Sequence, residues 1–166
     1  MARLVLVGLP ATGKTTVAQA LAGVWHCDYV DTDALIADRL GYSVGEYLRA
    51  NGEPAFRERE LEALRQALST DVVVATGGGV VVTAPARTML CAERTYWLDC
   101  DVDVLVERLA DGDRPLLTDD PRAALERLRA QREQWYLEVS RVRIDASGTL
   151  DDVTTRVREV AQKDEQ

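Results

Sequence analysis

Near the start of the chain, a loop framed by two glycines has the residue types of a phosphate site. The loop reads Gly8-Leu9-Pro10-Ala11-Thr12-Gly13-Lys14-Thr15-Thr16 and fits the pattern G-x-x-x-x-G-K-[ST] in full. Gly8 and Gly13 let the backbone bend, so that successive N–H groups meet phosphate oxygens at a helix N-terminus. Lys14 then reaches the β- and γ-phosphates, and the hydroxyl of Thr15 can bind the Mg²⁺ that bridges them. An ordinary strand-to-helix turn is the alternative, but the full match predicts binding of a nucleoside triphosphate. The predicted nucleotide contacts in this loop are Gly8, Ala11, Thr12, Gly13, Lys14, Thr15 and Thr16.

Two carboxylates follow the second apolar run, Tyr29-Val30. They belong to the sequence Asp31-Thr32-Asp33, which precedes a helical pattern. Capping of that helix accounts for one of the three residues. Two carboxylates beside a phosphate loop can divide the chemistry, because one can hold Mg²⁺ through water while the other accepts a proton from a substrate hydroxyl. We favour Asp31 for the metal and Asp33 for the substrate.

Three consecutive glycines, Gly77-Gly78-Gly79, follow the apolar run Val72 to Ala75 and Thr76. A tight turn needs only one or two glycines, and each further glycine adds conformational entropy that folding must overcome. Three in a row therefore indicate that something approaches the backbone closely. We expect substrate or the γ-phosphate to pack there.

A polar stretch from Asp111 to Asp120 carries the sequence Asp113-Arg114-Pro115-Leu116-Leu117. An exposed connector would explain its composition. Phosphoryl transfer, however, needs positive charge at the transferring group and exclusion of water, and a mobile loop with an arginine supplies both. We therefore expect a lid that delivers Arg114.

Two further arginines stand on predicted helices. Arg57 and Glu60 lie three residues apart, so they could form a surface ion pair that stabilises the helix by a few tenths of a kcal/mol. Alternatively, Glu60 orients Arg57 for a bidentate grip on a substrate carboxylate. Arg132 belongs to an arginine-rich helix, and by itself it is typical of a solvated face.

Short apolar runs alternate with helical patterns along the whole chain, which predicts a mainly parallel sheet covered on both faces. Ligands then bind at the carboxyl ends of the strands, where the junctions described above fall. The predicted strands are 4–7, 29–30, 72–75, 95–98 and 142–144, and the predicted helices are 17–22 directly after the phosphate loop, then 34–40, 44–48, 55–68, 85–91, 101–110, 121–140 and 150–160.

Length and composition bound the class of protein. At 166 residues and 46% hydrophobic, the chain suits one compact domain, 1–166. It has no apolar segment long enough to cross a membrane and no signal-peptide pattern, so we expect a cytoplasmic protein. A formal net charge of −8, from 20 basic and 28 acidic residues, disfavours nucleic acid as a partner.

The remaining reactive side chains give covalent chemistry little support. Cys27, Cys91 and Cys100 are odd in number and lack metal-ligand spacing, so we expect small buried hydrophobes rather than a disulfide framework or a zinc site. The single histidine, His26, is expected to be structural. The tail 162–166 is expected to fray.

Taken together, these segments resemble the shikimate kinase family over nearly the whole chain. The phosphate loop alone is generic, whereas the other segments are specific to that family. They stand in family order as 8–15, 29–33, 41–44, 52–57 with Glu60, 77–79, 114–117, and Arg132 ahead of Tyr136.

The resemblance implies an α/β fold of three layers, a P-loop kinase of the nucleoside monophosphate kinase type with a five-stranded parallel sheet. The lid would span about 111–120 and the substrate-binding helices about 33–62. It also implies transfer of the γ-phosphoryl group of MgATP to the 3-hydroxyl of shikimate, in aromatic amino-acid biosynthesis. We expect a monomer whose partners are these two small molecules, with no nucleic acid and no membrane.

The resemblance further implies a role for each matched residue. Asp33 would bind the reactive hydroxyl, while Arg57, Gly78 and Arg132 would hold the substrate's carboxylate and ring. Three more assignments concern the nucleotide: Thr15 and Asp31 would serve Mg²⁺, Lys14 and Arg114 would stabilise the phosphates, and Arg108 would stack on adenine.

One position departs from the family, and two alternative functions stay open. Leu48 stands where some relatives place an aromatic ring, and the adjacent Tyr47 would face elsewhere on a helix. The chain could instead phosphorylate a related hydroxy acid such as gluconate, or it could be a catalytically silent ATP-binding module. The set of Arg57, Gly78 and Arg132 argues against the first, and the retained lysine, aspartates and lid arginine argue against the second.

Overall fold

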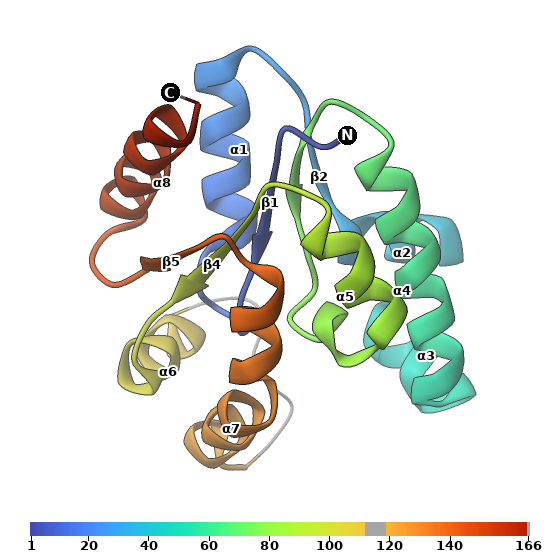
Figure 1. Cartoon of the computed structure of the whole chain (residues 1–166). Helices are drawn as coiled ribbons and strands as arrows, with labels where there is room; N and C mark the ends of the chain where they lie inside the picture. The colour runs from blue at the N-terminus through green and yellow to red at the C-terminus, as the bar shows by residue number, and fades with distance from the viewer. Residues whose placement is uncertain (112–118, 166) are drawn as a thin grey trace.

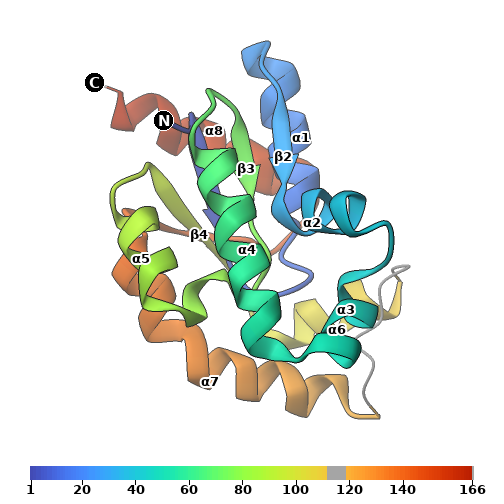
Figure 2. The same cartoon turned by 90° about the vertical axis from the view of Figure 1, so that its right-hand side faces the viewer.

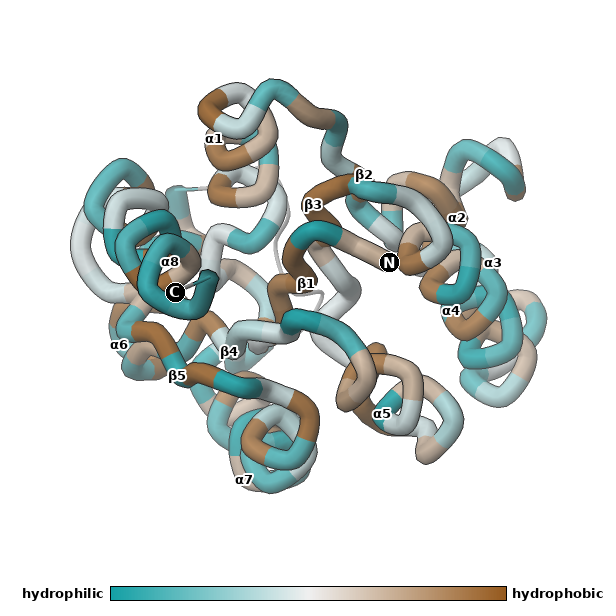
Figure 3. The backbone as a smooth tube through the Cα atoms, turned by 45° about the horizontal axis from the view of Figure 1, so that its top comes forward, coloured by the Kyte–Doolittle hydropathy of each residue, from teal (hydrophilic) through white to brown (hydrophobic). Residues whose placement is uncertain are grey.

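A parallel β-sheet forms the middle layer of the molecule, and helices cover both of its faces (Figures 1 and 3). The computed structural model describes residues 1–111 and 119–165. In this part of the chain the sheet has five strands in the order β2-β3-β1-β4-β5, and every pairing is parallel. The strands are β1 (Leu4–Val7), β2 (Tyr29–Asp31), β3 (Val73–Ala75), β4 (Thr95–Asp99) and β5 (Val142–Asp145). The predicted fold class is thus confirmed.

The helices that the structure describes fall into two layers and a flanking group. Helices α1 and α8 pack together over one face, whereas α4, α5 and α7 lie over the other, with α6 packed against α7. Helices α2 and α3 pack against α4 beyond the β2 edge (Figures 1 and 2). Their bounds are α1 (Lys14–Trp25), α2 (Thr32–Leu40), α3 (Val44–Asn51), α4 (Glu53–Leu68), α5 (Ala84–Cys91), α6 (Val102–Ala110), α7 (Pro121–Val139) and α8 (Leu150–Asp164), with a 3₁₀ turn η1 at Val80–Val82.

The core follows from the apolar strands. All four residues of the central strand β1 are fully buried, as expected for a strand covered on both faces (Figure 3). In register, Val5 pairs with Val74 on one side and Thr95 on the other. A second, smaller cluster of Ile36, Tyr47, Phe56 and Ala63 joins α2, α3 and α4 to one another. This cluster fixes the helices that carry the predicted substrate residues.

Several local expectations were wrong for physical reasons. Helix α2 begins at Thr32 rather than at residue 34, because the side chain of Asp31 caps it. Of the cysteines, only Cys100 is buried, whereas Cys91 is exposed at the end of α5.

No helix in the described ranges has the length and apolar character needed to cross a membrane.

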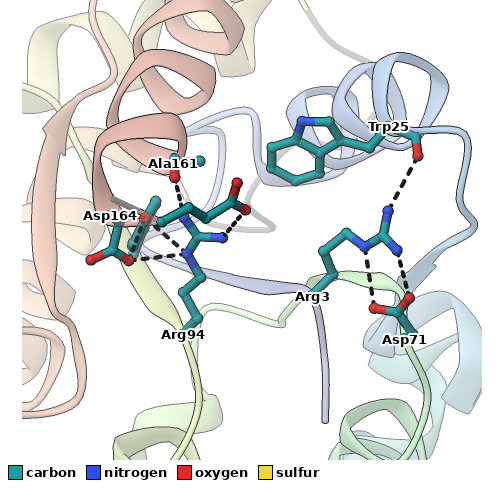
Figure 4. A network of polar contacts seen from close by, with 8 residues as sticks. Arg3, Trp25, Asp71, Arg94, Ala161 and Asp164 are labelled. Atoms are coloured by element: carbon teal, nitrogen blue, oxygen red, sulfur yellow. Dashed lines mark hydrogen bonds and ion pairs between the residues drawn. The ribbon is translucent and has the colours of Figure 1, made fainter.

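The expected fraying of the tail was also wrong, because α8 continues to Asp164. Arg94 precedes β4 and donates to Oδ2 of Asp164 at 3.0 Å and to Oε1 of Glu165 at 2.9 Å (Figure 4). Beside it, Arg3 precedes β1 and forms an ion pair with Asp71 at 2.6 Å. These ion pairs lie at the amino ends of β1 and β4, opposite the carboxyl ends where the predicted site residues fall.

Candidate active site

The phosphate-binding loop has the backbone that its glycines allow. Gly8 and Gly13 adopt φ values of 150° and 93°, and Ala11 adopts 67°. A Cβ at Gly8 would lie 2.4 Å from the carbonyl oxygen of Leu98, so only glycine fits beside β4. Helix α1 begins directly after Gly13, without a side-chain cap or an acidic residue in its first turn. Its first N–H groups are therefore directed at an anion site.

Lys14 lies under this loop as a buried cation. It is 8% exposed, and its Nζ donates to the carbonyl oxygens of Gly8 and Leu9, each at 2.8 Å. Burial lowers the pKa of Lys14 to about 8, although the charges of Asp33 and Asp31 oppose the shift. The ammonium thus lies close to the carboxylates of Asp31, the last residue of β2, and Asp33 in α2.

Asp31 combines the two roles that the sequence left open. Its Oδ1 accepts from the backbone N–H groups of Asp33 and Ala34 at 2.9 and 3.1 Å, which caps α2. Its Oδ2 accepts a hydrogen bond from the hydroxyl of Thr15. One carboxylate oxygen therefore serves the fold, and the other lies beside the hydroxyl at the start of α1.

This donor set fits Mg²⁺. The metal prefers oxygen ligands and keeps several waters, so it is bound through one or two protein oxygens together with phosphates. Thr15 and Asp31 supply a hydroxyl and a carboxylate of this kind. Within residues 1–111 and 119–165, no group of three or more His, Cys, Asp or Glu side chains could hold a metal ion without phosphates.

The three glycines after β3 make room for other residues of the same site. A Cβ at Gly77 would lie 2.5 Å from Oδ1 of Asp33, and a Cβ at Gly79 would lie 2.5 Å from Nη1 of Arg57. At Gly78 the nearest atom would be Cδ of Pro10, at 3.1 Å. Close approach of the protein's own groups therefore already requires glycine at these positions, and the expected packing of substrate or γ-phosphate stays a prediction.

Arg57 and Glu60 form an ion pair in which Glu60 is buried and Arg57 is half-buried, so the pair is not the exposed surface pair considered above. Nη1 of Arg57 lies 2.8 Å from Oε2 of Glu60, whose residue is only 2% exposed. Burial raises the pKa of Glu60, while the charge of Arg57 opposes that rise. Arg57 forms a second ion pair, from its Nη2 to Oε1 of Glu53 at 3.1 Å, so two carboxylates hold the guanidinium.

Two polar atoms near this pair have no hydrogen-bond partner among the described residues. They are Oε1 of Glu60 and Nε of Arg132, and both are buried. The charge of Arg132 acts on Glu60 and on Lys14, which places Arg132 near both. A buried donor and a buried acceptor without partners are costly, and ligand sites are where such atoms are tolerated.

Arg108 has a role that its sequence context did not reveal. Its guanidinium donates to the carbonyl oxygens of Ala11 and Thr12 in the phosphate loop, at 3.3 and 3.2 Å. It also donates to Ala146 and Gly148, at 2.7 and 3.0 Å, in the segment between β5 and α8. Arg108 thus joins two distant segments, and its stacking on adenine stays a prediction.

Other predicted residues are placed as follows. Thr12 is buried and donates its hydroxyl to the carbonyl oxygen of Leu9, whereas Thr16 is exposed. Leu48 is half-buried against the small cluster of α2 to α4, and Tyr47 is buried in that cluster. Arg114 and the core of the predicted lid lie outside the described residues.

Thr32 and Tyr136 were not predicted to contribute to the site, although each places a buried hydroxyl group beside the glycines. The backbone N–H of Gly77 donates to Oγ1 of Thr32, and the phenol of Tyr136 donates to the carbonyl oxygen of Gly78. The spacing of four residues between Arg132 and Tyr136 was a signal for the second, because such residues share a helix face.

The arrangement combines an anion-binding loop and its lysine with a hydroxyl–carboxylate pair, a further carboxylate and two arginines. All of these come from the carboxyl ends of β1, β2 and β3 or from helices that pack beside them. Such a site can align a nucleoside triphosphate with the hydroxyl group of a small acid.

Comparison with known proteins agrees with this chemistry. The family profile described as shikimate kinase matches residues 10–162. The shikimate kinase of Corynebacterium jeikeium is 40% identical over 148 residues, which are 88% of this chain and 80% of that protein. The structure of shikimate kinase from Acinetobacter baumannii in complex with shikimate has a TM-score of 0.90 at 30% identity, covering 97% of this chain and 93% of that one. A gluconokinase from Sinorhizobium meliloti 1021 has a TM-score of 0.65 at 15% identity, which is a likeness of fold alone.

Proposed function

The chain belongs to the shikimate kinase family, and we propose that its site transfers the γ-phosphoryl group of ATP to the 3-hydroxyl of shikimate. The family uses ATP as co-substrate with Mg²⁺ and acts in aromatic amino-acid biosynthesis. One observation supports the residue assignments most strongly. Asp33 and Arg57 both pack against the glycine loop 77–79, and the charges of Asp33 and Arg132 both act on Lys14 of the phosphate loop.

The nucleotide phosphates bind at the N-terminus of α1. The free N–H groups after Gly13 and the ammonium of Lys14 meet the phosphate oxygens, and Thr15 and Asp31 would hold Mg²⁺. Bound Mg²⁺ neutralises negative charge on the phosphates. Because the transition state is loose, Lys14 contributes mainly by alignment and by stabilising charge on the transferring group.

The acceptor binds beside the glycine loop 77–79, next to Asp33 and Arg57. Arg57 and Arg132 would hold the carboxylate of shikimate, with Glu60 fixing the direction of Arg57. The backbone of Gly78 would line the ring. Asp33 would bind the 3-hydroxyl and accept its proton as the bond to phosphorus forms.

Some parts of this proposal rest on the sequence. We propose that Arg114 closes over the phosphates from a lid at about 111–120, and that residues 1–166 form one domain. We also propose a monomer, as the family resemblance implies. A cytoplasmic location with no nucleic-acid partner is proposed on the acidic composition and the use of ATP.

Product analysis tests the reaction itself. After incubation with shikimate, ATP and Mg²⁺, ³¹P NMR should show a phosphomonoester, and mass spectrometry should give one added phosphate on shikimate. Absence of that product while ATP is hydrolysed to ADP would contradict the proposed acceptor.

A Gly79→Ala variant should lose affinity for shikimate selectively. The new Cβ would lie within 3 Å of the Arg57 guanidinium, so it pushes that side chain out of line. We expect KM for shikimate to rise about tenfold, with KM for ATP nearly unchanged. Gly23→Ala is the matched control, because Gly23 in α1 has no atom within 4 Å of its Cβ position. An unchanged KM for shikimate in Gly79→Ala would contradict the placing of Arg57.

The pH dependence should report Lys14. Its pKa of about 8 means that the free enzyme carries the ammonium below this pH and loses it above. We expect kcat/KM for ATP to be level below about pH 8 and to fall as the pH rises further. Bound phosphates raise the pKa of Lys14, so kcat at saturating ATP should fall at a higher pH. If kcat/KM for ATP and kcat began to fall at the same pH, Lys14 would not be the group that titrates.

A further inference from the structure

The glycine loop 77–79 is held from two sides by buried hydroxyl groups. On the side of α2, Thr32 is 0% exposed, and its Oγ1 accepts from the N–H of Gly77 at 3.1 Å. On the side of α7, Tyr136 is 1% exposed, and its phenol donates to the carbonyl oxygen of Gly78 at 2.5 Å. Helices α2 and α7 approach from different sides of the site (Figure 2).

Each glycine of this loop supports a different part of the site. Gly77 packs on the carboxylate of Asp33, Gly78 packs on Pro10 of the phosphate loop, and Gly79 packs on the guanidinium of Arg57. At each position a Cβ would come within 3.1 Å of its neighbour, so the backbone leaves almost no free space. A small displacement of the loop must therefore move the acceptor-binding groups together.

Tyr136 is itself firmly placed. Its ring stacks on Trp97 with centroids 5.7 Å apart, and Arg132 lies four residues before it on the same face of α7. Burial raises the pKa of Tyr136 to about 12, although the charge of Arg132 acts in the opposite direction. The phenol thus stays protonated and remains a hydrogen-bond donor over the working pH range.

We propose that Tyr136 and Thr32 are positioning residues for the acceptor. They hold the backbone of Gly77 and Gly78 so that Asp33, Arg57 and Arg132 converge on one shikimate molecule. This inference rests on the proposed function and adds two residues that act through the backbone of the glycine loop.

The test compares Tyr136→Phe and Thr32→Val with the wild-type enzyme in steady-state kinetics. Each variant keeps the size of the side chain and removes only the hydroxyl group. We expect KM for shikimate to rise about fivefold or more in each, with a smaller fall in kcat and KM for ATP within about twofold. Thermal unfolding and circular dichroism establish that each variant is folded.

Tyr96→Phe is the matched control. Tyr96 is also a buried tyrosine, 0% exposed, with a pKa raised to about 12 mainly by burial. Its hydroxyl donates to Asp164 at 2.9 Å at the amino ends of the strands, away from the site. A stability loss from deleting a buried hydroxyl should therefore occur in this variant too, without a change in KM.

The outcomes separate positioning from structural roles. A raised KM for shikimate in Tyr136→Phe and Thr32→Val, with wild-type KM in Tyr96→Phe, supports the proposal. A wild-type KM for shikimate in either folded site variant, or an equal rise in Tyr96→Phe, overturns it. If Tyr136→Phe does not accumulate as folded protein, Thr32→Val decides alone. Wild-type enzyme without activity on shikimate would instead refute the proposed function.

Discussion

Replacement of Lys14 by methionine is expected to lower kcat/KM by about 10³-fold, because the site loses the ammonium that we propose stabilises the transferring phosphoryl group. The buried position of Lys14 amplifies the effect. Its charge lies in a place from which water is excluded, and the loop carbonyl oxygens of Gly8 and Leu9 already hold it in place. Steady-state ADP release at several ATP concentrations measures the loss.

The chain offers a matched control for this variant. It contains two lysines, and the other, Lys163, is exposed in the last turn of α8. Lys163→Met should therefore keep wild-type kinetics. Retention of more than about a tenth of wild-type kcat/KM by Lys14→Met would show that the phosphate loop acts without its lysine.

Replacement of Asp33 by asparagine should reduce kcat by about 10²- to 10³-fold while leaving KM for ATP within a factor of about three. The amide keeps the shape of the carboxylate beside Gly77, but it cannot accept the proton of the 3-hydroxyl. The nucleotide site keeps its loop, its lysine and the Thr15–Asp31 pair. Turnover should therefore suffer much more than ATP binding.

Asp38→Asn on the exposed side of the same helix is the control for a general effect of losing one negative charge. It should behave as wild type. Equal losses of turnover and ATP affinity in Asp33→Asn would mean that Asp33 supports the nucleotide site rather than the acceptor.

Local patterns predicted the fold and the phosphate loop well, because their causes are local. Apolar β-branched runs specify strands that are buried on both faces, and Gly8 and Gly13 are needed by the backbone of the loop itself. The same holds for the pairing of Arg57 with Glu60, whose spacing of three residues brings them together on one helix.

Long-range packing decided what the sequence could not. Nothing in the spacing of Arg57 and Glu60 revealed that Glu60 is buried, and nothing in a run of glycines tells which groups approach it. Arg108 contacts carbonyl oxygens about 40 and 100 residues away, so its tethering of two loops has no local signature. Asp31 is a further case, since one oxygen of its carboxylate caps α2 and the other accepts a hydrogen bond from Thr15.

The C-terminal tail and the predicted lid are two further segments for which the sequence alone was not sufficient. Fraying was expected for 162–166 because the segment is terminal, but ion pairs from Arg94 to Asp164 and Glu165 hold the end of α8. For Arg114, the prediction still rests on the composition of its loop and on the family resemblance.

The most direct test is a coupled assay of ADP release with saturating ATP and Mg²⁺, with shikimate, gluconate and adenosine monophosphate offered in parallel. Arg57→Ala is assayed beside Arg59→Ala, whose guanidinium is exposed on the same helix and paired with Glu62. We predict rapid ADP release with shikimate alone, abolished in Arg57→Ala and retained in Arg59→Ala. Background release with shikimate, or equal release with gluconate, would contradict the account.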